Sequence, residues 1–139
     1  LPFAHRQGKK ESVAWILSAG NINSVLDIGV GSGTYSTLLR KSRPILANAK
    51  WYGIEAWSNY ISEYDLNKKY DVLFNEDARR FDWSKLPNID LTIFGDVLEH
   101  MTKLEAQELV NVALNYSKYV LISIPIQHAP QGASYGRRK

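Results

Sequence analysis

Short apolar runs alternate along this chain with stretches in which apolar residues recur at helical spacing. The runs predict five strands, at 25–28, 50–55, 72–74, 91–94 and 119–124. Helical spacing predicts helices over about 10–19, 34–41, 58–66 and 104–116. Strands that alternate with helices imply a parallel sheet covered on both faces. The predicted fold class is therefore α/β, with a doubly wound, mainly parallel sheet.

Three glycines follow the first predicted strand: Gly29, Gly31 and Gly33. Glycine lets the backbone turn sharply and lets a ligand approach the main chain without meeting a Cβ atom. The helix predicted to follow would present free N–H groups at its start. The pattern predicts a ligand-binding turn, and a plain turn between strand and helix is the alternative interpretation.

Acidic residues occur at or just beyond the ends of four predicted strands. They are Asp27, Glu55, Asp77 and Asp96. The carboxyl ends of parallel strands meet at one edge of the sheet, where open α/β sheets bind their ligands. Glu55 follows Gly33 by about 22 residues, a spacing at which an acid meets ribose hydroxyls. Four carboxylates would repel a pyrophosphate and favour a ligand with a positive centre, unless each acid merely caps a helix or lies in a loop.

Composition narrows the classes of protein further. The 139 residues, 45% of them hydrophobic and 22% charged, suit one soluble domain. The absence of cysteine excludes disulfides, thiolate nucleophiles and cysteine-ligated metals. No apolar stretch approaches the roughly 20 residues of a membrane helix, and no signal-peptide core is recognisable, so we expect a cytoplasmic protein without membrane contact. The net charge of +3 equals the contribution of Arg137, Arg138 and Lys139, which is weak evidence for nucleic-acid binding.

Four segments together resemble the class I S-adenosylmethionine-dependent methyltransferases. They are Val-Leu-Asp-Ile-Gly-Val-Gly-Ser-Gly at 25–33, Gly-Ile-Glu at 53–55, Glu-Asp-Ala at 76–78 and Asp-Val-Leu-Glu-His-Met at 96–101. The resemblance spans 24–125 and implies a Rossmann-like domain that binds S-adenosyl-L-methionine and transfers its methyl group. We accordingly divide a single domain, 1–139, into an N-terminal helical segment at 1–23, a cofactor-binding core at 24–126 and a polar tail at 127–139.

The resemblance also implies roles for individual residues. The glycine turn would pass under the methionine part of the cofactor, Glu55 would bind both ribose hydroxyls, and Asp77 would accept from the adenine amino group. The backbone N–H of Ala78 would reach a ring nitrogen, and Trp57 would flank the adenine, unless it is a buried core tryptophan. The full predicted cofactor-binding set is Asp27, Gly29, Gly31, Gly33, Glu55, Ala56, Trp57, Asp77, Ala78, Gly95 and Asp96.

Beyond the cofactor-binding residues, this type of catalysis requires few groups from the protein. A sulfonium methyl is already activated, so the protein has to align the acceptor and exclude water. His100 is the candidate base for an acceptor that carries a proton, and a structural hydrogen bond at the helix entrance is the alternative role. The run Asp96-x-x-Glu99-His100 also resembles the metal-binding Glu-x-x-Glu-His element of small-RNA 2′-O-methyltransferases, with His128 as a further ligand. Because these residues can simply order the turn, we predict a site without metal.

The sequence leaves the acceptor open. The family's sheet usually has seven strands, and this chain ends after the fifth predicted strand, so we expect the C-terminal strands to be missing. A small-molecule acceptor is favoured over nucleic acid or protein, and a homodimer is a candidate assembly. Two other functions remain open: a nicotinamide-dependent oxidoreductase and a non-catalytic binding or scaffold protein. Thr34 stands where the third glycine of Gly-x-Gly-x-x-Gly would fall, which argues against the oxidoreductase.

Overall fold

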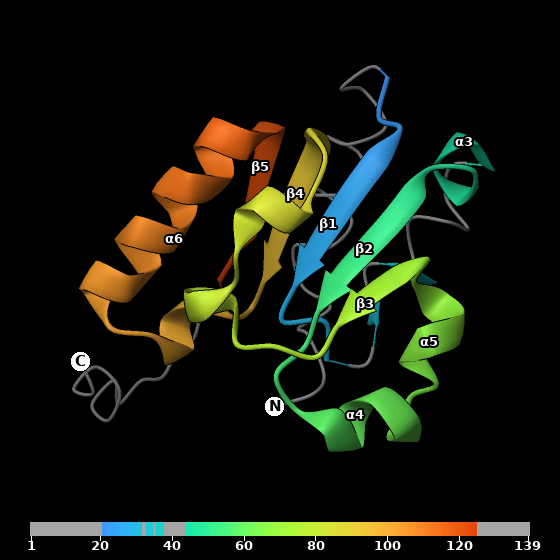
Figure 1. Ribbon diagram of the computed structural model, residues 1–139, viewed down its shortest axis with the longest axis horizontal. Helices are drawn as coiled ribbons and strands as arrows, with labels where there is room; N and C mark the ends of the chain where they lie inside the picture. Colours follow the sequence, from blue (N-terminus) through green and yellow to red (C-terminus); the bar gives the residue numbers. More distant parts are fainter. Residues whose placement is uncertain (1–20, 32, 35, 38–43, 125–139) are drawn as a thin grey trace, which may run out of the picture.

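A parallel sheet forms the centre of the protein (Figure 1). The computed structural model describes residues 21–31, 33–34, 36–37 and 44–124. Within these residues the sheet has five strands in the order β3-β2-β1-β4-β5, and every neighbouring pair is parallel. The strands are β1 (Ser24–Ile28), β2 (Lys50–Ile54), β3 (Val72–Phe74), β4 (Ile89–Gly95) and β5 (Ser117–Ser123). The predicted fold class is confirmed.

The helices connect successive strands. The α-helices of the described segments are α3 (Pro44–Ala47), α4 (Ser58–Glu63), α5 (Leu66–Lys69) and α6 (Lys103–Tyr116). In the same segments, short 3₁₀ helices follow strand ends or lie in loops: η1 (Ala78–Arg80), η2 (Trp83–Lys85) and η3 (Leu98–His100). Among the described residues, none of the helices combines the length and apolar character that crossing a membrane requires.

Two apolar clusters cover the two faces of the sheet. Successive strand residues point to opposite faces, and in β1 Val25 joins one cluster while Leu26 joins the other. Leu66 of α5 packs in the cluster of Val25, and Leu109 of α6 packs in the cluster of Leu26. Figure 1 shows α6 beside β4 and β5, with α4 and α5 beyond β2 and β3. The central strands β1, β2 and β4 are therefore buried on both faces, as their near-continuous apolar runs indicate, whereas the edge strands β3 and β5 are partly exposed.

The strand order reverses between β1 and β4. The chain runs outward from β1 through β2 to β3, and then returns so that β4 pairs with the other side of β1. At such a switch point the loops after the two strands part and leave a crevice outside the carboxyl ends. The glycine turn after β1 and the Gly95–Asp96 pair at the end of β4 border this crevice.

One predicted helix differs from the structure. A single helix was expected over 58–66, and the chain instead forms α4 and α5 with a break between them. Asp65 has a φ of 52°, a left-handed conformation that an α-helix cannot continue through. The helix over 104–116 is confirmed as α6, which begins one residue earlier. The predicted helix over 10–19 and most of the one over 34–41 lie outside the described residues.

Candidate cofactor-binding site

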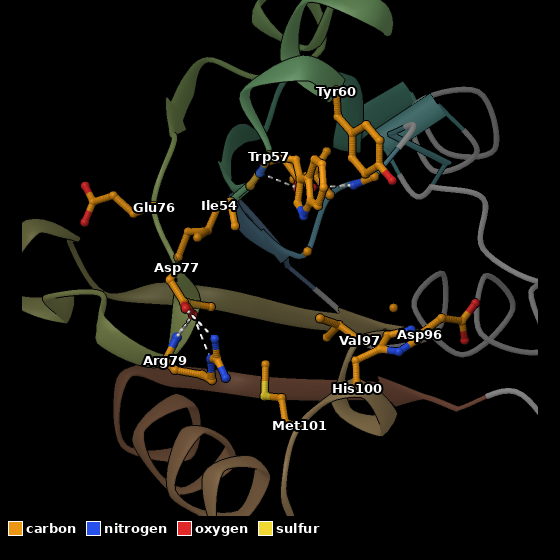
Figure 2. Close-up of a pocket in the computed structure, with 17 residues that line it drawn as sticks. Ile54, Trp57, Tyr60, Glu76, Asp77, Arg79, Asp96, Val97, His100 and Met101 are labelled. Carbon is orange, nitrogen blue, oxygen red and sulfur yellow. Dashed lines mark hydrogen bonds and ion pairs between the residues drawn. The ribbon is translucent and has the colours of Figure 1, made fainter. Parts of the chain in front are cut away.

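A cavity of about 340 Å³ lies at the carboxyl edge of the sheet (Figure 2). Its volume falls within the range of small-molecule sites. The predicted site residues that line it are Gly29, Gly31, Glu55, Ala56, Trp57, Asp77, Ala78, Gly95, Asp96 and His100. Segments that are distant in sequence therefore meet around one space, as their positions at strand ends predict.

The glycine turn forms the part of the cavity next to β1. Gly29 and Gly31 have φ angles of +68° and +56°, in the left-handed region that costs other residues free energy. A Cβ atom on Gly29 would lie 2.7 Å from Cγ2 of Val97, so the turn also approaches the loop after β4 too closely for a side chain. The backbone N–H of Gly29 donates to Ile54 O at 2.9 Å, which ties the turn to the end of β2.

Glu55 follows β2 directly and is 5% exposed. Its Oε1 accepts from the backbone N–H of Gly31 at 2.8 Å, and its Oε2 accepts from that of Trp57 at 3.0 Å. An ionised carboxylate offers about four acceptor positions, so positions remain for hydroxyl groups of a ligand. Glu55 therefore both orders the glycine turn and presents a carboxylate at the cavity.

Trp57 is an exposed side chain and not a core tryptophan. Its exposed fraction is 62%, and its ring stacks on that of Tyr60 with centroids 5.9 Å apart and an interplanar angle of 22°. Both rings line the cavity, and Figure 2 shows them side by side at its upper margin. The arrangement offers an aromatic surface on which a planar base could stack.

Asp77 and Ala78 follow β3 and place an acceptor beside a donor. The Asp77 carboxylate caps η1, accepting from the backbone N–H of Arg79 at 2.9 Å, and it also receives the Arg79 side chain. The hydrogen bonds from that guanidinium hold the pKa of Asp77 below its ordinary value, although partial burial opposes them. Within the described segments, no acceptor is bonded to the backbone N–H of Ala78.

Asp96 and His100 line the cavity on the β4 side. Asp96 has a φ of 58°, and its Oδ1 accepts from the Ser123 hydroxyl at 3.2 Å. Left-handed backbone at a residue other than glycine is strained and tends to occur at functional sites. The His100 side chain is 59% exposed, and its Nε2 lies 3.6 Å from Oε2 of Glu99.

Two predicted site residues, Asp27 and Gly33, are not among the lining residues. The pleat of β1 places Asp27 on the face of Val25, where Leu66 of α5 packs. There Asp27 is 2% exposed and accepts from the Tyr70 hydroxyl at 2.5 Å. Gly33 has a φ of +79° and approaches α5 instead, since a Cβ atom there would lie 2.9 Å from Cδ of Lys69.

We expect the Tyr70→Phe variant to lower the free energy of unfolding by about 1.5–3 kcal/mol, because it removes a hydrogen bond to a buried carboxylate. Urea denaturation of the full chain measures the change. Tyr116→Phe is the control, since this ring is 37% exposed and its hydroxyl has no hydrogen bond to a described residue. Equal stabilities of the two variants would contradict the structural role of the Tyr70–Asp27 bond.

No group of three or more histidine or acidic side chains within the described segments is arranged to hold a metal ion. Asp96, Glu99 and His100 are described, and His128 lies outside the described residues.

The cavity also contains residues that the sequence reasoning missed. They are Val30, Ile54, Tyr60, Glu76, Arg79, Val97 and Met101. Tyr60 could have been found, because it lies three residues after Trp57 in a predicted helix and therefore shares its face. The sequence signal for Arg79 was weaker. It consists only of the position of Arg79 two residues after an aspartate that caps a turn.

Comparison with known proteins shows which solved structures share this fold. No protein-family model matches the sequence, and no curated protein matches it. Among solved structures, the N-terminal domain of EvdMO1 with S-adenosylhomocysteine bound is similar with a TM-score of 0.64 and 18% identity, over 82% of this chain and 48% of that one. The sugar N-methyltransferase KedS8 from a Streptoalloteichus species gives 0.65 and 14%, over 89% and 49%. DhpI, solved with SAM and HEP, gives 0.64 and 15%, over 96% and 63%.

The protein has the fold of the class I S-adenosylmethionine-dependent methyltransferases. The chain spans about half the length of EvdMO1 and KedS8 as solved, and less than two thirds of DhpI.

Proposed function

We propose that this chain binds S-adenosylmethionine and belongs to an enzyme that transfers the cofactor's methyl group to an acceptor. The main observation that supports the proposal is that Glu55 and the Asp77–Ala78 pair line one cavity. The glycine turn also borders this cavity. These groups supply the contacts that an adenosyl group requires. They are a carboxylate for the ribose hydroxyls, an acceptor and a donor for the adenine, and close access to the backbone. The fold likeness to proteins solved with SAM or S-adenosylhomocysteine supports the same cofactor.

The charge of the cavity supports a cationic cofactor over a dinucleotide. In the described part of the chain, four acids line it: Glu55, Glu76, Asp77 and Asp96. Of the described residues that line it, Arg79 is the one arginine or lysine. A field of this sign attracts a sulfonium and repels a pyrophosphate, which counts against the nicotinamide-dependent oxidoreductase.

When bound, S-adenosylmethionine supplies a methyl group that is activated by the positive sulfur. The chain's own residues hold it: Glu55 at the ribose, the Asp77–Ala78 pair and Trp57 at the adenine, and the turn at Gly29 with Asp96 near the amino acid part. We propose His100 as the group that removes a proton from the acceptor, because it lines the cavity and an imidazole is the side chain that most often acts as a general base.

Ligand binding tests the proposal directly. Titration calorimetry of the full chain is expected to detect S-adenosylmethionine and S-adenosylhomocysteine and to give no heat with NAD. Tighter binding of NAD would overturn the assignment and favour the oxidoreductase. A screen with methyl-labelled cofactor across small metabolites, peptides, RNA and DNA then separates an enzyme from a scaffold, since a scaffold would bind the cofactor and methylate none of them.

We propose a small molecule as the acceptor class. KedS8 is named as a sugar methyltransferase, and its fold is similar to that of this chain. The net charge of +3 equals the contribution of the last three residues, so the remaining chain has no excess of positive charge for nucleic acid. A homodimer and a cytoplasmic location remain predictions, which light scattering and cell fractionation would test.

A further inference from the structure

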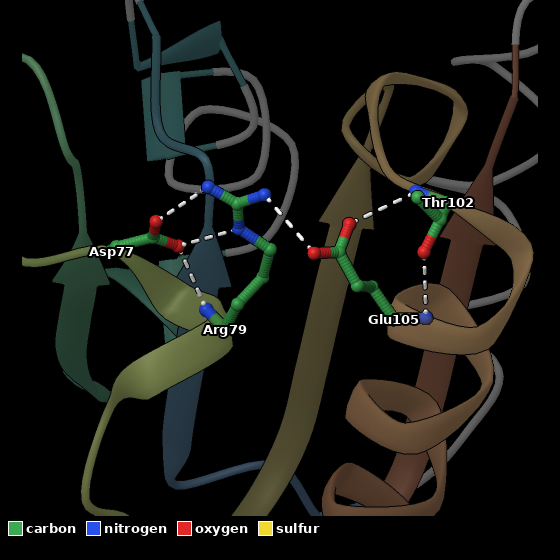
Figure 3. Close-up of polar contacts among 4 residues, drawn as sticks. All are labelled: Asp77, Arg79, Thr102 and Glu105. Atoms are coloured by element: carbon green, nitrogen blue, oxygen red, sulfur yellow. Dashed lines mark hydrogen bonds and ion pairs between the residues drawn. The ribbon is translucent and has the colours of Figure 1, made fainter.

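Arg79 holds the Asp77 carboxylate from two directions (Figure 3). The Arg79 backbone N–H and Nε donate to Oδ1 of Asp77 at 2.9 and 3.0 Å, and Nη2 donates to Oδ2 at 2.6 Å. A planar guanidinium that contacts both oxygens of a carboxylate restrains its rotation as well as its position. Three of about four acceptor positions are then used. One position on Oδ2 is left, within the described part of the chain, beside a cavity that both residues line.

The same guanidinium is fixed on its far side by helix α6. Its Nη1 donates to Oε2 of Glu105 at 3.3 Å. Glu105 is itself restrained, because its Oε1 accepts from the Thr102 backbone N–H at 3.0 Å while its own N–H donates to the Thr102 hydroxyl at 3.1 Å. This capping box makes the start of α6 a rigid support. The orientation of Asp77 is therefore set by a chain of contacts from a different segment of the protein.

We propose that Arg79 is a positioning residue that makes the site select adenine over bases with a 6-keto group, by holding Asp77 with one carboxylate oxygen toward the cavity. The inference rests on the proposed function and adds a determinant of base specificity to it. Arg79 acts through Asp77 in this proposal and need not touch the base.

The donor and acceptor pattern of the two bases explains the selection. An ionised carboxylate only accepts hydrogen bonds, and the backbone N–H of Ala78 only donates. Adenine presents an amino donor next to a ring-nitrogen acceptor, which matches both groups. Hypoxanthine presents a keto acceptor next to a ring N–H, so both contacts are mismatched. The lowered pKa of Asp77, caused first by the Arg79 side chain, keeps the carboxyl ionised to more acidic pH and so supports an acceptor-only role.

The experiment compares two ligands that differ only at the base. Titration calorimetry on the full chain measures affinities for S-adenosylhomocysteine and for its deaminated analogue S-inosylhomocysteine, in the wild type and in Arg79→Met. Methionine keeps an unbranched side chain and removes the guanidinium, while the backbone N–H of residue 79 still caps η1. We expect the preference for the adenine ligand to fall about tenfold in Arg79→Met. Arg80→Met is the matched control, since the Arg80 side chain is not hydrogen-bonded to Asp77, and it should keep the wild-type preference.

Each outcome is decisive. If the wild type fails to bind S-adenosylhomocysteine, the proposed function itself is overturned. If the wild type binds and Arg79→Met weakens both ligands equally, Arg79 is merely structural and the inference is overturned. Tighter binding of S-adenosylhomocysteine by Arg79→Met would also overturn it, because Arg79 would then obstruct the base. Should Arg79→Met not fold, Arg79→Lys retains the charge without the planar fork and is expected to show the same loss of preference.

Discussion

Replacing Glu55 with alanine is expected to weaken S-adenosylhomocysteine binding on the order of 100-fold. Hydrogen bonds to a charged group contribute about 1.5–3 kcal/mol each, and Glu55 has acceptor positions left for two ribose hydroxyls. The variant also removes the acceptor for the Gly31 and Trp57 N–H groups. The glycine turn and the stacking tryptophan should therefore lose order at the same time. Titration calorimetry with S-adenosylhomocysteine measures the effect.

Two further variants separate these contributions. Glu55→Gln keeps an oxygen acceptor and the size of the side chain, so it should bind more tightly than Glu55→Ala and less tightly than the wild type. Glu63→Ala removes an exposed acid at the end of α4 that does not line the cavity, and it should bind like the wild type. Equal affinities of Glu55→Ala and Glu63→Ala would remove Glu55 from the site.

The sheet and its functional edge could be predicted because they depend on local patterns. The run at 25–28 is apolar at positions that point to both faces, which indicates a strand buried on both sides. Once five such strands alternate with helices, parallel pairing and right-handed crossovers leave few arrangements. The acids after β2, β3 and β4 then had to come to one edge, and the structure brings Glu55, Asp77 and Asp96 to one cavity.

The direction of a side chain is harder to predict than its position along a strand. We predicted Asp27 in the site from its place near the end of β1, and the structure places it on the face of Val25 and not among the described lining residues, since a shift of one residue along a strand reverses the face. Ile28, the next residue, is the one on the face of Leu26. Counting the pleat from Val25 would have placed Asp27 under α5, although only the tertiary structure could supply Tyr70 as its partner.

The contacts of Arg79 could not be predicted for a different reason. Its partner Glu105 lies 26 residues later and on another element, so no local spacing connects the two. The break at Asp65 was also hidden, because aspartate enters the left-handed region only occasionally and its presence alone does not predict a helix end. Sequence reasoning thus finds residues that act from fixed positions at strand ends, and it misses the residues that orient them.

Replacing Gly29 with alanine is expected to lower the free energy of unfolding by about 2–4 kcal/mol. A left-handed φ of +68° costs a residue with a Cβ roughly 1–2 kcal/mol. The new methyl group would also lie 2.7 Å from Cγ2 of Val97, so the loop after β4 would have to move, and overpacking of this kind costs about 1–3 kcal/mol. Urea denaturation of the full chain measures the total, and S-adenosylhomocysteine binding should weaken because both segments line the cavity.

A double-mutant cycle with Val97→Ala separates the backbone cost from the steric cost. Val97→Ala removes Cγ2, the atom nearest to the new methyl group, so the double variant should lose less stability than the sum of the two single variants, by about 1 kcal/mol or more. The backbone cost should persist in the double variant, because the φ of residue 29 is unchanged. Strict additivity of the two changes in the free energy of unfolding would mean that the turn after β1 and the loop after β4 are not in steric contact. The close approach on this side of the cavity would then be wrong.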